Sequence, residues 1–97
     1  MKGKTAEKEF LFISVIGKDK KGIVATISNY LYKKGVNIED INQKVMEGYF
    51  VMTMVVDAKD SKQSIEKIRE ELEKIGTKMK VMISIRHENI FKMMHRI

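Results

Sequence analysis

The sequence predicts a single α+β domain whose elements follow one another in the order β-α-β-β-α-β. Three observations lead to this prediction. A short apolar run rich in β-branched and aromatic residues comes first, two segments with helical spacing of apolar residues follow, and a glycine ends each of those segments. The length of 97 residues allows one core of modest size, so a single domain is expected.

The first half of the chain indicates a strand, a helix and a second strand. Residues 10–17, FLFISVIG, form the apolar run and end in glycine, as a buried strand does. After Gly22, apolar residues recur every four positions, which is the spacing of one helix face; they are Ile23, Ile27 and Leu31. Gly35 ends this helix, and residues 36–46 then predict a second, partly polar strand.

The next segments predict a hairpin and a second helix. A turn at Gly48 joins the second strand to residues 49–58, YFVMTMVVDA, which read as a third strand. Asp60 or Ser61 is expected to cap the second helix, and Gly76 is expected to end it. The apolar positions of this helix lie three or four residues apart; they are Ile65, Ile68, Leu72 and Ile75.

A fourth strand completes the pattern. Residues 77–87, TKMKVMISIRH, alternate apolar and polar side chains with a period of two. The whole order is that of the ferredoxin-like fold, in which a four-stranded antiparallel sheet carries both helices on one face. We therefore expect a domain over residues 9–86, preceded by a flexible lead-in at residues 1–8.

The first and third strands are apolar on both of their faces. In the first strand, Leu11, Ile13 and Val15 oppose Phe10, Phe12 and Ile16. In the third, Tyr49, Val51 and Val55 oppose Phe50, Met52, Met54 and Val56. The sheet face away from the helices should therefore be covered as well, by a second chain or by the C-terminal segment.

The C-terminal segment, residues 87–97, is the second candidate for that cover. Its apolar residues fall on one helical face, so we expect a short helix that docks on the domain; they are Ile90, Phe91, Met94 and Ile97.

Composition excludes several classes of protein. There is no cysteine, which rules out disulfides and thiolate metal sites and fits a cytoplasmic location. No apolar run approaches the ~20 residues of a membrane span, and the N-terminus lacks the apolar region of a secretory signal. The net charge of +6 comes mostly from lysines scattered among glutamates, which is typical of a solvated surface.

The loop at residues 17–22, GKDKKG, is the most informative candidate site. Two glycines four residues apart between a strand and a helix resemble a phosphate-binding loop. Ile23 and Val24, however, stand where such a loop needs lysine and then serine or threonine, so a nucleotide site is excluded. The N–H groups that begin the helix could still bind a small anion or carboxylate, or the glycines could simply permit a tight turn.

The other groups of residues considered do not indicate an RNA-binding, metal-binding or catalytic site. The third strand lacks two of the aromatic residues with which RNA-recognition motifs stack bases, since Val51 and Met54 occupy those places. His87 and His95 lie eight residues apart without an evident third ligand, so no metal site is expected. No catalytic group and no cofactor are predicted.

Residues 15–45 resemble an ACT domain, and the resemblance extends over residues 10–97. That family has a Gly-x-Asp-x-x-Gly-[Ile/Leu/Val] turn after its first strand, then a helix ending in glycine, and then Asn-Ile; the matching residues are Gly17, Asp19, Gly22, Ile23, Gly35, Asn37 and Ile38. The ending HENIFKMMHRI is similar to that of small stand-alone prokaryotic ACT proteins. Lys21 departs from the proline that many relatives have at this position.

The resemblance implies a regulatory module rather than an enzyme. ACT domains typically pair and bind amino acids or similar ligands between two domains. One chain would supply Gly17, Lys18, Asp19, Gly22, Ile23 and Val24, and its neighbour would supply Asn37, Ile38 and Asp40. We therefore expect a homodimer that binds an amino-acid-like molecule and regulates a partner protein, with no membrane attachment. A nucleic-acid-binding protein of the same fold is the alternative.

Overall fold

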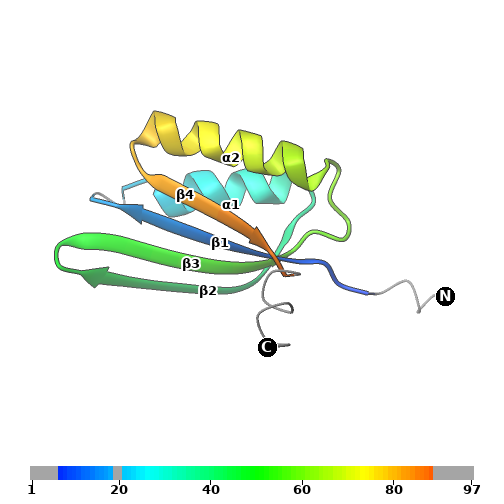
Figure 1. Cartoon of the computed structure of the whole chain (residues 1–97), viewed down its shortest axis with the longest axis horizontal. Coiled ribbons are helices and arrows are strands. Elements are labelled where there is room, and N and C mark those ends of the chain that lie inside the picture. Colours follow the sequence, from blue (N-terminus) through cyan, green and yellow to red (C-terminus); the bar gives the residue numbers. More distant parts are fainter. Residues whose placement is uncertain (1–6, 19–20, 89–97) are drawn as a thin grey trace, which may run out of the picture.

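The computed structural model describes residues 7–18 and 21–88 and confirms the expected order of elements (Figure 1). The elements are β1 (Phe10–Gly17), α1 (Ile23–Lys33), β2 (Asn37–Met46), β3 (Tyr49–Asp57), α2 (Ile65–Met79) and β4 (Met82–His87). The expected C-terminal helix falls almost wholly on residues 89–97 and therefore lies outside the described residues.

The four strands form one antiparallel sheet in the order β2-β3-β1-β4. Figure 1 shows α1 and α2 lying side by side on one face of this sheet, as the ferredoxin-like fold requires. The order places β1 between β3 and β4, so the end of β1 meets the start of both strands.

The core lies between the helices and the sheet. Alternate residues of β1 and β3 point into it and are almost completely buried; they are Leu11, Ile13, Val15, Met52, Met54 and Val56. The helices contribute Ile23, Ile27 and Leu31 from α1, and Ile68 and Leu72 from α2. These are the positions that the helical spacing predicts.

The bounds of α2 differ from the prediction at both ends. Ser64, rather than Asp60 or Ser61, caps the helix, because its Oγ accepts a hydrogen bond of 3.1 Å from the N–H of Lys67. The helix continues through Gly76 to Met79, and Lys80 caps its end with a left-handed backbone of φ 61°. Gly76 therefore does not end the helix. A Cβ at this position would lie 2.9 Å from the carbonyl oxygen of Val81, so the glycine allows close packing.

This longer helix also shortens the fourth strand. β4 begins at Met82, five residues later than the alternation predicted. Lys78 and Met79 belong to the last turn of α2, and the apolar spacing of Met79 and Val81 happens to fit both a helix end and a strand. Both residues pack against the core.

The second face of the sheet, which we call the open face, has no cover from a described helix. The two-sided apolar pattern of β1 and β3 is confirmed, because alternate residues of both strands point away from the helices. Several of its apolar side chains are exposed; they are Ile16, Met46, Tyr49 and Met82.

Candidate functional site

The loop between β1 and α1 needs glycine at two positions for two different reasons. At Gly17 a Cβ would lie 2.5 Å from Cγ1 of Val81, so no larger residue fits without a shift. Gly22 has a φ of 76°, the left-handed conformation that glycine adopts without strain, and it leads directly into α1. The fold thus explains both glycines without a ligand. Asp19 lies outside the described residues.

The first residues of α1 face the core. Ile23 is 1% exposed, and Val24 is half-buried against the same core. The Ile23 side chain packs in the core, and part of Val24 remains accessible at the surface. What they can offer is their backbone, since the first N–H groups of a helix lack partners within the helix and carry its positive dipole.

A pocket of about 580 Å³ lies beside this loop. We call it the loop pocket; its lining consists of Ile16, Gly17, Lys18, Tyr49, Lys80, Val81 and Met82. Its walls are mostly apolar, and the two lysines are exposed. The arrangement suits a small molecule with a carboxylate and an apolar part.

Sequence reasoning identified two residues of the loop pocket, Gly17 and Lys18, and missed the rest. Tyr49, Lys80 and Met82 reach the pocket because the sheet places the starts of β3 and β4 beside the end of β1. The one signal available in the sequence was the apolar second face of the third strand, since Tyr49 belongs to it.

The second set of expected site residues lies at the other end of the sheet. Asn37 pairs with Asp57, and Asp57 pairs with Phe10 at the start of β1. The two sets therefore lie about 23 Å apart along the strands, since the eight residues of β1 are separated by seven steps of roughly 3.3 Å. One chain does not bring them together.

Each expected site residue at that end makes a contact within its own chain. The Asn37 side-chain amide donates to Glu39 over 3.0 Å, and Ile38 packs against the core. Asp40 is exposed, and its carboxylate accepts a hydrogen bond of 3.0 Å from the N–H of Ile41.

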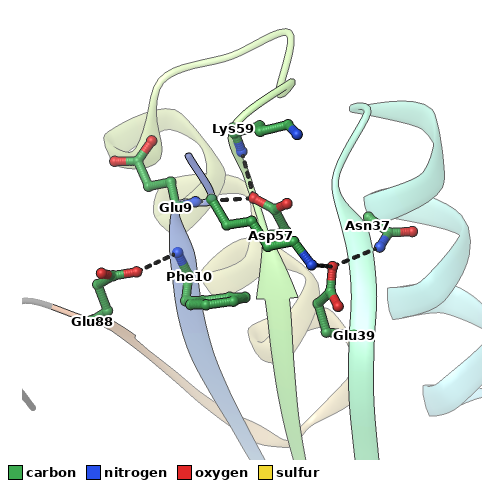
Figure 2. A network of polar contacts seen from close by, with 8 residues as sticks. Glu9, Phe10, Asn37, Glu39, Asp57, Lys59 and Glu88 are labelled. Atoms are coloured by element: carbon green, nitrogen blue, oxygen red, sulfur yellow. Dashed lines mark hydrogen bonds and ion pairs between the residues drawn. The ribbon is translucent and has the colours of Figure 1, made fainter. Parts of the chain in front are cut away.

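A polar network joins the four strands at the same end (Figure 2). The carboxylate of Asp57 is buried and accepts hydrogen bonds from the N–H groups of Glu9 at 3.0 Å and Lys59 at 3.1 Å. Burial raises the pKa of Asp57, but these two donors and the nearby lysines outweigh burial, so the pKa is lowered overall. The carboxylate therefore stays ionised and ties the segment before β1 to the end of β3.

Two further contacts complete this end of the molecule. Glu88 accepts a hydrogen bond of 2.8 Å from the N–H of Phe10, and the His87 ring lies 3.0 Å from a carboxylate oxygen of Glu9. A polar cavity of about 480 Å³ opens beside them. Within residues 7–18 and 21–88, no cluster of His, Cys, Asp and Glu side chains could hold a metal ion.

No helix in the described part of the chain is long and apolar enough to cross a membrane.

Comparison with known proteins relates the chain to one family. The family model described as the ACT domain matches residues 9–86. A UPF0237 protein of Methanocaldococcus jannaschii is 46% identical over 85 residues, which cover 88% of this chain and 94% of that protein. A UPF0237 protein of Clostridium perfringens is 42% identical over 85 residues, which cover 88% of this chain and 96% of the relative.

Solved structures agree with this relationship. An ACT domain protein from Streptococcus pneumoniae superimposes with a TM-score of 0.78 at 41% identity, covering 88% of this chain and 96% of that one. A formyltetrahydrofolate deformylase from Pseudomonas syringae superimposes with a TM-score of 0.76 at 20% identity. The match covers 86% of this chain and 28% of the deformylase, and it shows a shared fold.

Proposed function

This chain belongs to the ACT domain family, and on that premise we propose that it is a non-catalytic regulatory module. It binds an amino acid or a related small metabolite between two copies of the chain and passes the signal to a separate partner protein. ACT domains are in general regulatory and bind small ligands. A module that does not itself catalyse a reaction would act through a change in what it contacts.

The observation that carries this proposal is the loop pocket. It lies beside the glycine loop of the ACT pattern, and it combines apolar walls with the ammonium groups of Lys18 and Lys80. A carboxylate would be attracted to those two groups, while an apolar side chain would pack against Ile16 and Met82.

The loop pocket alone offers no described carboxylate for the ammonium group of an amino acid. A second chain would supply the missing groups, and Asn37, Ile38 and Asp40 are candidates because they are exposed or near the surface at the other end of the sheet. A ligand held by two chains stabilises the pair in which its site is complete.

A ligand screen tests this function. Purified protein is titrated with the twenty amino acids and the matching 2-oxo acids while the thermal midpoint is recorded. We expect at least one compound to raise the midpoint in a saturable way, and Lys80→Ala to weaken its affinity by about five- to tenfold because one charge-assisted contact is lost.

The control is Lys78→Ala, which removes an equally exposed lysine that does not line the loop pocket. It should leave the affinity unchanged. If no compound shifts the midpoint, or if both variants weaken binding equally, the loop pocket is not the ligand site.

Nucleic-acid binding is the alternative, and no contact within the described residues favours it. Met54, at one of the places where an RNA-recognition motif has a stacking aromatic, points into the core and is 1% exposed. Binding of single-stranded RNA that persists in moderate salt would reverse this ranking.

A further inference from the structure

Three rows of side chains cross the open face at right angles to the strands. The central row consists of Asn42, Thr53, Ser14 and Ser84. The loop-end row, next to the loop pocket, consists of Lys44, Val51, Ile16 and Met82. The far-end row consists of Asp40, Val55, Phe12 and Arg86.

The three rows differ in chemistry. Every member of the central row is small and polar and can both donate and accept a hydrogen bond. Each outer row has two apolar residues in its middle, one on β3 and one on β1, and a charged side chain at its β2 end. The charged residue is Lys44 in the loop-end row and Asp40 in the far-end row, and both side chains are exposed.

We propose that two copies of this chain stack their open faces about a two-fold axis that runs along the central row. This inference rests on the pairing of chains in the proposed function. Such an axis places each strand over the same strand of the partner, and the two strands run in opposite directions. The loop-end row of one chain then lies against the far-end row of the other.

Three of the four contacts between the outer rows are complementary in this arrangement. Ile16 meets the partner's Phe12, and Val51 meets the partner's Val55, so apolar side chains cover one another. Lys44 meets the partner's Asp40, and symmetry makes this ion pair occur twice. The central row meets itself, which its paired donor and acceptor groups allow.

The opposite orientation is disfavoured by charge. An axis parallel to the strands would place the loop end of one chain over the loop end of the other. The lysines of both chains at that end would then gather at one end of the pair; they are Lys18, Lys44 and Lys80. Like charges placed together across an interface weaken association.

Pairing through the exposed edge of β2 is disfavoured as well. The ladder between β2 and β3 is irregular between Ile38 and Asp40, and the strand carries charged residues along its length. Bulges and charges are devices by which edge strands avoid pairing with other chains.

The stacked arrangement also brings a residue of the second chain to the loop pocket. Met82 lines that pocket, and the partner's Arg86 lies over Met82. A guanidinium group binds a carboxylate through two parallel hydrogen bonds. In this arrangement the second chain adds Arg86 to the site, and Asp40, a candidate ligand group in the proposed function, pairs with Lys44 instead.

A charge-reversal cycle tests the arrangement. Sedimentation equilibrium at low ionic strength gives the dimer dissociation constant for the wild type, Asp40→Lys, Lys44→Glu and the double variant. Each single reversal turns both symmetric ion pairs into like-charge pairs, so we expect dimerisation to weaken about tenfold. The double variant restores opposite charges and should return to within about threefold of the wild type.

Matched controls lie on the helical layer. Glu73→Lys and Lys74→Glu reverse exposed charges on α2, away from the open face, and should leave dimerisation unchanged. A fluorescent label provides a second measurement. Because the chain has no cysteine, a single introduced cysteine is the only one that the label can modify. Pyrene attached to Asn42→Cys should give excimer emission, since Asn42 lies over its own copy in this arrangement and over β4 in the other one.

The outcomes separate this inference from the proposed function. A dimer that binds ligand but is indifferent to both reversals, or that gives no excimer, overturns the stacking and leaves the ligand site standing. A monomer that dimerises only after residues 89–97 are removed shows that the C-terminal segment covers the open face, which also overturns the stacking. A stacked dimer that responds to no ligand overturns the proposed function alone.

Discussion

Gly17 lies so close to Val81 that a Cβ on Gly17 would be 2.5 Å from Cγ1 of the valine. The contact joins the end of β1 to the residue before β4, and it forms one wall of the loop pocket. Valine is stiff about its first side-chain torsion, so Val81 cannot turn away from an added methyl group at low cost.

Gly17→Ala is therefore expected to destabilise the fold by about 1–3 kcal/mol, the range for overpacking a tight site. Urea unfolding followed by circular dichroism measures the loss. The companion variant Gly17→Ala with Val81→Ala removes the clashing atom and should recover part of the loss. A single variant as stable as the wild type would contradict the close contact.

This glycine also shows how far sequence reasoning reaches. Its place after an apolar run correctly marked the end of a strand, because strand and helix periods are local properties of the chain. The order of all six elements follows from the same periods. The reason that Gly17 must be glycine was not accessible, since Val81 approaches it only through the order of strands in the sheet.

The same limit explains the errors at α2. Gly76 looked like a helix end because glycine commonly is one, yet here it permits close approach to the backbone of Val81. The candidate site divides in the same way. The glycine loop is a local pattern and was found, whereas Tyr49, Lys80 and Met82 come together with it only in three dimensions.

Asp57 gives a prediction about acid stability. Asp57→Ala leaves the N–H groups of Glu9 and Lys59 without their acceptor, so the free energy of unfolding at neutral pH should fall by about 1–3 kcal/mol. The pKa of Asp57 is lowered from its ordinary value of 3.8. Its stabilising effect is thus complete above that value and is lost as the pH falls through the lowered pKa.

The measurement is urea unfolding of both proteins between neutral pH and pH about 2. The difference in stability should shrink at the acid end. Asp60→Ala, which removes an exposed carboxylate nearby, serves as the control and should change stability little. A difference in stability between wild type and Asp57→Ala that stays constant with pH would show that the Asp57 charge does not stabilise the fold.

Tyr30 and Glu71 connect the two helices and predict a stability profile with two limits. The Tyr30 hydroxyl donates a hydrogen bond of 2.6 Å to the Glu71 carboxylate. Burial, together with this bond and the adjacent charge, raises the pKa of Tyr30 above its ordinary value of 10.0. The bond from Tyr30 likewise lowers the pKa of Glu71 below its ordinary value of 4.5.

The directions of the two pKa shifts define the pH range over which this hydrogen bond stabilises the fold. A raised tyrosine pKa gives a stabilisation that is complete below pH 10.0 and is lost as the pH rises above it. A lowered glutamate pKa gives one that is complete above pH 4.5 and is lost as the pH falls through the lowered value.

Tyr30→Phe should accordingly lower the thermal midpoint by a few degrees at neutral pH and by less at both extremes. Tyr32→Phe is the matched control, since Tyr32 is 81% exposed on the same helix. Equal effects of the two variants, or an effect independent of pH, would contradict a stabilising hydrogen bond between the helices.

Lys80 combines a strained backbone with a place in the loop pocket. Its φ of 61° is left-handed, which costs a residue with a side chain about 1 kcal/mol relative to glycine. Strain of this kind clusters at functional sites and is also common where a helix ends. Lys80→Gly should therefore raise the free energy of unfolding by about 0.5–1 kcal/mol while weakening the response to the ligand found in the screen.

Glu47→Gly separates the two effects. Glu47 also has a left-handed backbone, with φ of 51°, but it lies in the turn between β2 and β3 and does not line the loop pocket. The variant should gain similar stability and keep the full ligand response. If Lys80→Gly gains stability and binds the ligand as well as the wild type does, the Lys80 ammonium takes no part in binding, and the strain at this position has no role in the loop pocket.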